Sequence, residues 1–414
     1  MSMLRPFMDA RALEGYVTRI RSDLENNILP FWIRYAVDRE RGGFVGALSD
    51  DLAVEPAPSR GALLTSRILW TYSASYRRRP DAALLKMAHH AYADLMTRFS
   101  DREHGGFLWS VDGTGRPLER RKQVYGQAFA IYALTEFHRA TGEQEPLDEA
   151  ISVFECLERH ARDRHHGGYL EAYAQDWSPI ADMRLSAVDM NEPKSQNTHL
   201  HVMEAYTNLM RVWPDARVRE AQRALLDLML TRILDSRTHH LGLFFTEAWE
   251  PRSDRYSYGH DIEASWLMWE AGEVLGDPAM LTRLRGPVVR IAEVTLAEGL
   301  DQDGAVFNEG GPAGLTNTDK EWWPQAEAVV GFINAYQVTG EERFLSAALR
   351  CWDFIEARII DRKHGEWIRG VSRDGAVLPG HPKISFWKCP YHNGRACIEA
   401  VERLRSVIAA APST

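Results

Sequence analysis

The sequence predicts an all-α fold: a closed (α/α)6 barrel of six helical hairpins, with short β-hairpins in the loops at one face. A turn motif that begins with Asp occurs six times, at intervals of about 60 to 72 residues. The segments between the turns have the periodicity of helices. In each unit one helix is apolar on nearly all sides and the other is amphipathic, which is typical of an inner and an outer helical layer. An open helical solenoid of the same units is the alternative architecture.

The turn motif is clearest where two glycines precede an aromatic residue, in "DRERGGF", "DREHGGF" and "DRHHGGY". The weaker copies keep the Asp and part of the pattern that follows it. The six motifs begin at Asp38, Asp101, Asp163, Asp235, Asp301 and Asp361. After the second motif, "GGFLWSVDGTG" alternates apolar and polar residues before an Asp-Gly turn, a pattern that predicts a short β-hairpin.

The segments between the turns supply both kinds of helix. Residues 83–99 place apolar side chains along one helical face, and residues 220–234 and 343–360 do the same, as outer helices should. Residues 125–142 are apolar nearly all round and end in Gly142, a residue typical of a helix C-terminus. We therefore expect this segment to be an inner helix.

Length and composition limit the class of protein. The chain has 414 residues without a linker or low-complexity segment, so residues 1–414 are expected to form one catalytic domain. The net charge of −9 argues against nucleic acid or an anionic membrane as partner. The sequence has no apolar signal region or membrane span, and its four cysteines have no disulfide spacing. We expect a cytoplasmic protein that is a monomer or a weak homodimer.

Each predicted inner helix begins with polar or aromatic side chains where apolar residues would pack better. In a closed barrel the inner helices run parallel, so their N-termini and these side chains meet at one mouth. Convergent polar groups in a concave site are the usual sign of an active site. The residues concerned are Arg67, Tyr125, Asn197, His199, His201, His260, Glu263, Trp322, Trp323, Glu327, Trp387, His392 and Arg395.

Three histidines at this mouth are the predicted catalytic residues: His201, His260 and His392. His260 and His392 lie in or near a first helical turn, where the positive end of the helix dipole favours the neutral ring that acts as a base. Glu263 follows His260 by three residues, so we expect its carboxylate to hold that ring in one tautomer. His199 points about 200° away from His201 around the helix and is predicted to be structural.

The same three histidines could instead form a three-histidine metal centre. The i, i+2 pair His199 and His201 diverges on a helix rather than chelating, and the sequence has no HExxH motif and no carboxylate-rich ligand set. It also has no Walker loop, no dinucleotide-binding GxGxxG and no nucleophile elbow. We therefore expect no metal and no other cofactor.

Neutral histidines that face each other across a pocket suit proton transfer at a carbon next to a carbonyl group. One histidine removes the proton and its partner donates one, each worth about 10²–10⁴-fold in rate, while Arg67 or His201 stabilises the oxyanion. The alternative enzyme is an (α/α)6 glycoside hydrolase, which needs two carboxylates beside the scissile bond. Glu263, Glu327 and Asp189 are the candidates for these two carboxylates. A hydrolase mechanism would leave the three histidines without a function.

The stretches "SQNTHLHVMEAY", "GHDIEASWL", "WWPQAEAV" and "FWKCPYHNGR" carry a further signal. In this order they resemble the acylglucosamine 2-epimerase superfamily, and most closely its cellobiose 2-epimerase branch. The resemblance implies an (α/α)6 barrel that epimerises the reducing-end glucose of β-1,4-linked disaccharides at C2, through a cis-enediol(ate) and without an organic cofactor. Mannose 2-epimerases and mannose–fructose isomerases of the same superfamily share this intermediate and are the alternatives.

The resemblance also implies a role for individual residues. His260 and His392 match the general acid/base pair, and His201 matches a third histidine that assists ring opening and substrate binding. The positions that match sugar-contacting or supporting residues are Arg67, Tyr125, Asn197, Glu263, Trp323 and Trp387, with Ser186 and Asp189 as weaker matches. The implied partner is a small sugar, either a disaccharide or a hexose.

Overall fold

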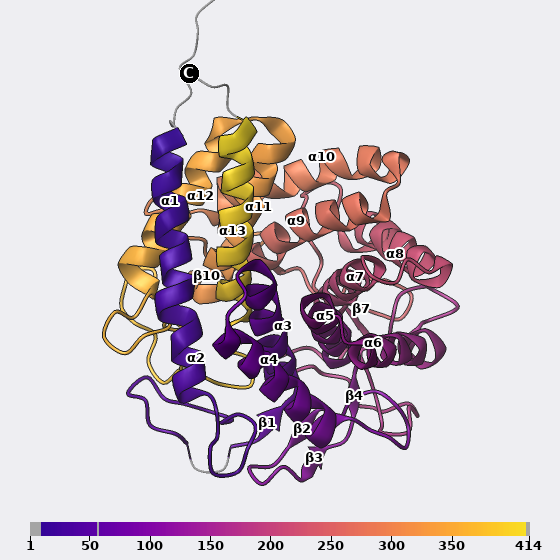
Figure 1. Cartoon of the computed structure of the whole chain (residues 1–414). Coiled ribbons are helices and arrows are strands. Elements are labelled where there is room, and N and C mark those ends of the chain that lie inside the picture. The colour runs from indigo at the N-terminus through magenta and orange to yellow at the C-terminus, as the bar shows by residue number, and fades with distance from the viewer. Residues whose placement is uncertain (1–9, 56–57, 411–414) are drawn as a thin grey trace, which may run out of the picture.

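An inner ring of helices surrounds the axis of the molecule (Figure 1). The structure is a computed structural model that describes residues 10–55 and 58–410. The inner helices are almost entirely buried because each packs against its two neighbours in the ring and against an outer helix. They are α3 (Ala62–Arg78), α5 (Val124–Thr141), α7 (Gln196–Met210), α9 (Tyr258–Leu275), α11 (Trp322–Thr339) and α13 (Tyr391–Ala410).

An outer layer of amphipathic helices covers the ring. Its helices are α1 (Ala10–Asp23), α2 (Leu29–Tyr35), α4 (Ala82–Asp94), α6 (Gln144–Cys156), α8 (Ala216–Leu228), α10 (Pro278–Val294) and α12 (Glu342–Phe354). A π-helical turn joins α1 to α2 and extends each of the other outer helices. These turns are η1 (Leu24–Ile28), η2 (Leu95–Phe99), η3 (Leu157–Ala161), η4 (Met229–Ile233), η5 (Thr295–Gly299) and η6 (Ile355–Ile359).

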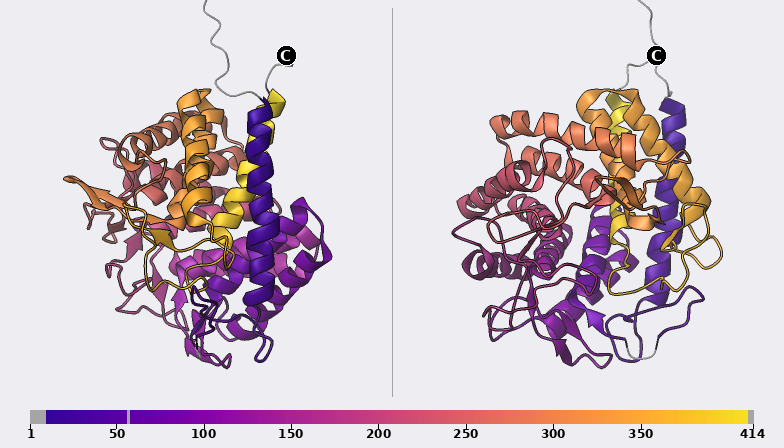
Figure 2. Two further views of the ribbon diagram at one scale, coloured as in Figure 1. Left: turned by 90° about the vertical axis from the view of Figure 1, so that its left-hand side faces the viewer. Right: turned by 180° about the vertical axis from the view of Figure 1, so that it is seen from behind.

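The ring is closed, so the barrel prediction is confirmed and the open solenoid is wrong. α13 packs against both α11 and α3, and α1 packs against α13, so the two ends of the chain form one hairpin of the barrel. The views in Figure 2 show α1 and α13 side by side and the loops gathered at one face. Gly142 has a φ of 77° after α5, the left-handed conformation of a helix C-terminus, as its position in the sequence predicts.

Short strands surround the mouth at the N-terminal ends of the inner helices. The strand before an inner helix pairs antiparallel with a strand of the following repeat, which ties neighbouring repeats together. The strands are β1 (Arg60–Gly61), β2 (Ser110–Val111), β3 (Pro117–Glu119), β4 (Lys122–Gln123), β5 (Ala172–Tyr173), β6 (Lys194–Ser195), β7 (Phe244–Phe245), β8 (Tyr256–Ser257), β9 (Glu309–Gly311), β10 (Gly314–Asn317), β11 (Lys320–Glu321) and β12 (Gly370–Val371).

The repeated Asp motif forms the turn between each outer helix and the mouth. The Asp side chain accepts backbone N–H groups of its own turn, and in five repeats it also pairs with a buried cation that precedes the next inner helix. We call this second contact the turn anchor. The anchors are Asp38–Arg60, Asp101–Lys122 at 2.7 Å, Asp163–Lys194 at 2.6 Å, Asp301–Lys320 at 2.7 Å and Asp361–Lys383 at 2.8 Å.

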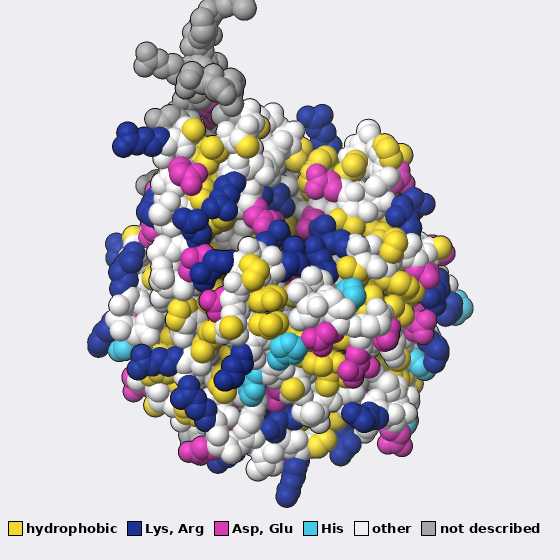
Figure 3. Space-filling model, in the orientation of Figure 1, with side chains coloured by type: hydrophobic (Ala, Val, Ile, Leu, Met, Phe, Trp, Pro, Cys, Tyr) yellow, Lys and Arg dark blue, Asp and Glu magenta, His cyan; other side chains and the backbone are white. Residues whose placement is uncertain are grey.

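The face opposite the mouth is charged. Figure 3 shows Lys and Arg side chains gathered near the middle of the face on view. A cavity of about 210 Å³ lies at the C-terminal ends of inner helices, where Arg77 and Arg139 both pair with the buried Glu136 and Arg211 pairs with Glu270. Within the described ranges, no helix is long and apolar enough to cross a membrane.

Candidate active site

The three predicted histidines lie on three different inner helices, close to the N-terminus of each. His201 lies in the second turn of α7, His260 is the third residue of α9 and His392 is the second residue of α13. The hydroxyl of Ser195 caps α7, and the hydroxyl of Ser257 accepts the backbone N–H of His260 at the start of α9. The sequence therefore places all three rings at the same end of the barrel.

Two of the histidines are held by carboxylates. Nδ1 of His201 lies 2.8 Å from an oxygen of Glu204, one turn further along α7. Nδ1 of His392 lies 2.7 Å from an oxygen of Glu327 on α11. A carboxylate on Nδ1 fixes the tautomer with its proton on Nδ1 and leaves Nε2 as the base, so both rings are oriented for proton transfer.

His260 differs from the other two histidines because its Nδ1 is buried without a hydrogen-bond partner among the described residues. The expectation that Glu263 holds this ring is wrong: the Glu263 carboxylate turns towards the barrel axis and accepts a hydrogen bond from Arg395 at 2.5 Å. The ring of His260 instead packs against Trp323, with 4.7 Å between ring centroids. Gly259 makes this packing possible, because a Cβ there would lie 2.5 Å from the Trp323 ring.

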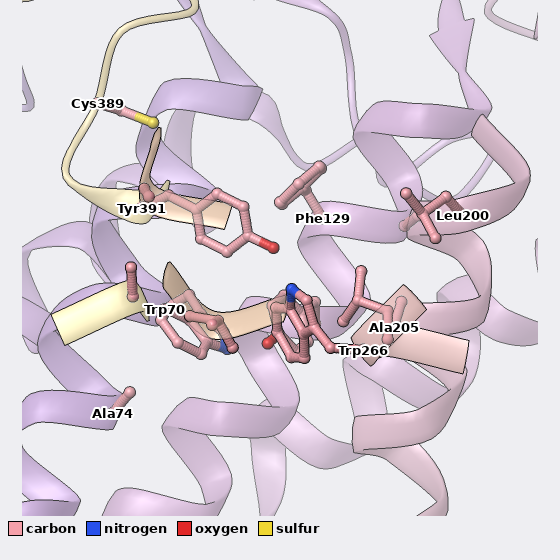
Figure 4. Close-up of a cluster of buried hydrophobic side chains, with 14 of the residues drawn as sticks. Trp70, Ala74, Phe129, Leu200, Ala205, Trp266, Cys389 and Tyr391 are labelled. Carbon is pink, nitrogen blue, oxygen red and sulfur yellow. The ribbon is translucent and has the colours of Figure 1, made fainter. Parts of the chain in front are cut away.

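Arg395 is the centre of a buried charge network that the sequence did not predict. Its guanidinium contacts carboxylates from three inner helices: Glu204 of α7, Glu263 of α9 at 2.5 Å and Glu327 of α11 at 2.7 Å. The hydroxyl of Tyr391 also donates to Glu204, and the indole N–H of Trp266 donates to Glu327 at 3.1 Å. Figure 4 shows Tyr391 and Trp266 pointing their polar atoms towards the same space between the helices.

This environment favours neutral rings at His260 and His392 and an ionised carboxylate at Glu204, whereas burial raises the pKa of Glu263 to about 7 and also raises that of Glu327. Burial, assisted by the charge of His201, lowers the pKa of His260 to about 3. Burial and the nearby charges of Arg67 and Arg395 lower the pKa of His392 well below its usual value. Burial opposes the ionisation of Glu204, but Arg395 and the hydrogen bond from His201 outweigh it and lower its pKa to about 2. Both His260 and His392 are therefore neutral bases near neutral pH.

Arg67 and Tyr125 form a second wall of the site, on α3 and α5. The Arg67 guanidinium is buried and donates to the Tyr125 hydroxyl at 2.6 Å and to the backbone oxygen of Trp387 at 3.4 Å. The Tyr125 ring packs against His201, with 5.1 Å between centroids. This arrangement brings a cation and a phenol next to one of the histidines, and the indole of Trp387 lies 6.3 Å from the Tyr125 ring, between centroids.

A cavity of about 540 Å³ opens outwards from His260 and Trp323. Asn197 and Asp189 line it, and Ser186 donates to Asp189 at 2.7 Å. Trp322 is buried whereas Trp323 also packs against His392, with 5.7 Å between ring centroids. Of the predicted substrate-contacting residues, Asn197, Asp189 and Trp323 thus line this cavity.

One cluster in the site has the donor atoms of a metal centre. Ligand atoms of Glu263, Glu327 and His392 all lie within 4.8 Å of one another. The Arg395 guanidinium already supplies the positive charge there, through its contacts with both carboxylates. This set of side chains is therefore a hydrogen-bonded ion cluster in which an arginine stands where a cation would bind.

Comparisons with known proteins agree with this geometry. Residues 42–392 match the model of the N-acylglucosamine 2-epimerase family. The chain is 44% identical to a cellobiose 2-epimerase of Bacteroides fragilis, over 92% of this chain and 97% of that protein. A solved structure of cellobiose 2-epimerase from Bacillus thermoamylovorans superposes with a TM-score of 0.89 at 39% identity, over 94% of this chain and all of that one. A D-mannose isomerase structure superposes with a TM-score of 0.82 at 21% identity over 93% of this chain and 97% of that one, which shows a shared fold. The chain belongs to the N-acylglucosamine 2-epimerase family.

Proposed function

We propose that the protein is a carbohydrate epimerase that inverts C2 of the reducing-end glucose of β-1,4-linked disaccharides. It converts cellobiose to glucosyl-mannose and lactose to epilactose, reversibly. Two findings support the substrate class: the identity of 44% to a cellobiose 2-epimerase, and a cavity of about 540 Å³ that extends beyond the histidines. Charged groups at the outer part of this cavity, among them Arg184, Glu192 and Arg255, offer hydrogen bonds to a second sugar ring.

The proposed reaction transfers one proton from C2 and returns one to the opposite face. After ring opening, one of His260 and His392 removes the C2 proton, and a cis-enediol(ate) forms. Rotation about the C2–C3 bond then presents the other face of C2 to the partner histidine, which returns a proton. His201 assists ring opening and, with Arg67, stabilises the oxygen that gains negative charge.

The observation that carries this proposal is that His260 and His392 both pack against Trp323. Ring centroids of the two histidines lie 4.7 Å and 5.7 Å from that of Trp323, and Trp323 and His260 line the cavity. Both rings are neutral near neutral pH, as a pair of proton-transfer bases requires. Asn197, Tyr125, Glu263, Trp387, Ser186 and Asp189 complete the proposed sugar-binding residues.

The glycoside hydrolase alternative fits the site poorly. A hydrolase needs two carboxyl groups free to act on the glycosidic oxygen and on C1 or a water molecule. Glu263 and Glu327 are instead bonded to Arg395, and Glu327 also orients His392. The second candidate, 2-epimerisation or isomerisation of mannose itself, uses the same histidines and differs in the size of the sugar and, for isomerisation, in which carbon is reprotonated.

The test is product analysis with purified protein and three separate substrates: cellobiose, lactose and mannose. Glucosyl-mannose from cellobiose and epilactose from lactose support the proposal. Turnover of mannose with cellobiose unchanged assigns the protein to the monosaccharide branch, with glucose or fructose as product separating epimerase from isomerase. Cleavage of cellobiose to glucose contradicts the mechanism. We propose that the enzyme acts as one catalytic domain without a metal or organic cofactor, in the cytoplasm, as a monomer or weak homodimer.

A further inference from the structure

The turn before α9 differs from the equivalent turns of the other five repeats. Those turns have a turn anchor in which the cation is Lys or Arg. In the fourth repeat, Tyr256 stands two residues before the inner helix, where its neighbours have Arg60, Lys122, Lys194 and Lys320. Asp235 pairs with Arg237 of its own turn, a side chain that is 87% exposed. The buried basic side chain of this turn is a histidine, His240.

His240 occupies the position of the second glycine of the motif. The N–H of the motif Asp donates to the carbonyl of Gly106 in the second repeat, of Gly168 in the third and of His240 in the fourth. Two acidic groups bind the His240 ring: Asp261 on α9, 2.7 Å from Nδ1, and Glu298 on η5, 3.3 Å from Nε2.

Aromatic contacts complete the surroundings of His240. Tyr256 of β8 stacks on its ring, with 3.6 Å between centroids and 4° between planes. The Tyr258 ring lies edge-on at 5.9 Å, and His239 is the neighbouring residue in the turn. Together with Asp261 and Glu298, these are the titratable groups that face the His240 ring.

The residue opposite this position differs from repeat to repeat. Gln127, His199 and Asp261 are each the fourth residue of their inner helix, and each accepts the backbone N–H that follows the turn position, at 2.8–2.9 Å. A Cβ on Gly106 would lie 2.6 Å from the Gln127 amide oxygen. The larger His240 is accommodated because Asp261 is one methylene shorter than Gln. His240 and Asp261 thus replace a neutral glycine–amide pair by an ionisable one.

In this replacement, Asp261 lies in the same helical turn as His260. Carboxylates orient His201 and His392, whereas Nδ1 of His260 has no hydrogen-bond partner within residues 10–55 and 58–410, so the position of the His260 ring depends on the first turn of α9. His240 holds that turn from both sides along the chain, through Tyr256 before His260 and Asp261 after it.

We propose that His240 is a positioning residue for His260 and that its protonated form clamps the first turn of α9, which gives the enzyme an alkaline limit of activity. For its activity readout this inference rests on the proposed function. Burial opposes protonation of His240, but the hydrogen bond and charge of Asp261, with the charge of Glu298, outweigh it and raise its pKa above the usual 6.5. The clamp is therefore complete below the ordinary histidine range and is lost as pH rises through the raised value.

The test replaces the His240–Asp261 pair of the fourth repeat by the Gly106–Gln127 pair of the second repeat. In His240→Gly/Asp261→Gln the turn gains the Gly106–Gln127 pair, which has no titratable group. Wild-type kcat falls by about threefold or more between about pH 7 and pH 9, with KM little changed, whereas kcat of the double variant is flat over this range. Thermal unfolding gives a readout independent of activity: the melting temperature of the wild type decreases over the same range more than that of the double variant.

Two single variants complete the design. Glu298→Gln removes the half-exposed partner and moves the alkaline limb towards lower pH. His199→Gln is the matched control, because it makes the same kind of exchange on α7 at a histidine whose pKa burial lowers to about 4; it leaves the shape of the pH profile unchanged. An alkaline limb that persists in the double variant overturns the proposal. If the double variant does not fold, an unmoved limb in Glu298→Gln overturns it. Absence of epimerase activity in the wild type refutes the proposed function, and the pH dependence of unfolding then decides the clamp alone.

Discussion

Nδ1 of His392 lies 2.7 Å from the carboxylate of Glu327, which comes from the neighbouring inner helix and also accepts a hydrogen bond from Arg395. The pair joins a proposed acid/base residue to the charge network on the barrel axis. Glu204 does the same for His201. Proton transfer at the mouth and stability of the barrel therefore depend on the same buried side chains.

Replacement of either proposed acid/base residue abolishes epimerisation. His260→Ala and His392→Ala each lose at least about 10²–10⁴-fold in kcat, because each removes one proton-transfer group. Neither ring forms part of the hydrophobic core, so both variants keep a cooperative thermal transition. Steady-state rates and circular dichroism are the measurements. An active single variant, or inactivity that comes with unfolding, contradicts the assignment.

Glu327→Gln tests the orientation of His392. The change removes the charge that fixes the Nδ1 tautomer, and we expect kcat to fall by about 10²–10⁴-fold while KM changes little. The matched control is Glu136→Gln on α5, an equally buried carboxylate that pairs with Arg77 and Arg139 at the opposite face. Equal losses of kcat in both variants would mean that the effect of Glu327 is structural.

The sequence was informative where the chemistry is local. Gly142 predicted a helix end, and the histidines near the helix starts predicted one mouth; both follow from spacing along a single helix. The Arg395 network was out of reach, because its carboxylates lie 68 to 191 residues away in the chain. Three Glu residues in nearly apolar helices were the available signal, since buried charges are almost always paired.

The partner of His260 was also mispredicted from local spacing. Glu263 is three residues after His260 and close enough for contact, but its carboxylate accepts a hydrogen bond from Arg395 on another helix instead. The role of His240 was missed for a similar reason: its partners Asp261 and Glu298 are 21 and 58 residues further along the chain. Contacts between repeats decide these side chains, and the pattern within one repeat does not reveal them.

Arg395→Met tests the stability of the network. The variant leaves three buried carboxylates without their cation, and breaking such a pair costs about 3–5 kcal/mol in free energy of unfolding. The pH dependence of the free energy of unfolding also differs between wild type and variant. In the wild type, the lowered pKa of Glu204 stabilises the fold above the ordinary pKa of 4.5, and this stabilisation is lost as pH falls towards about 2. In the variant, acidification restores stability by protonating the carboxylates. Urea unfolding at several pH values measures both effects, and a variant as stable as the wild type would contradict the network.

Activity should persist on the acid side of the ordinary histidine range. The pKa of His260 is lowered to about 3 and that of His392 is also lowered, so both bases stay neutral well below 6.5. The profile of kcat/KM against pH reports the free enzyme. We expect no acid limb centred near 6.5, over a range where the protein remains folded. If the pH profile of kcat/KM shows such a limb and the pH profile of stability does not, an acid/base histidine keeps its ordinary pKa.

Chelation of divalent metals should leave the rate unchanged. The carboxylates beside His392 already have a cation in Arg395, so no metal is required to balance their charge. The measurement is the rate after incubation with EDTA and dialysis. Loss of activity that a divalent metal restores would revive the three-histidine centre.

Proton NMR of the enzyme with cellobiose in deuterated water tests the central claim most directly. Proton transfer by His260 and His392 predicts that the C2 proton signal disappears as glucosyl-mannose forms, because the protonated base exchanges with solvent before it returns a proton. The glycosidic linkage stays intact throughout. Cleavage of the disaccharide without exchange at C2 would contradict the account and assign the chemistry to the carboxylates.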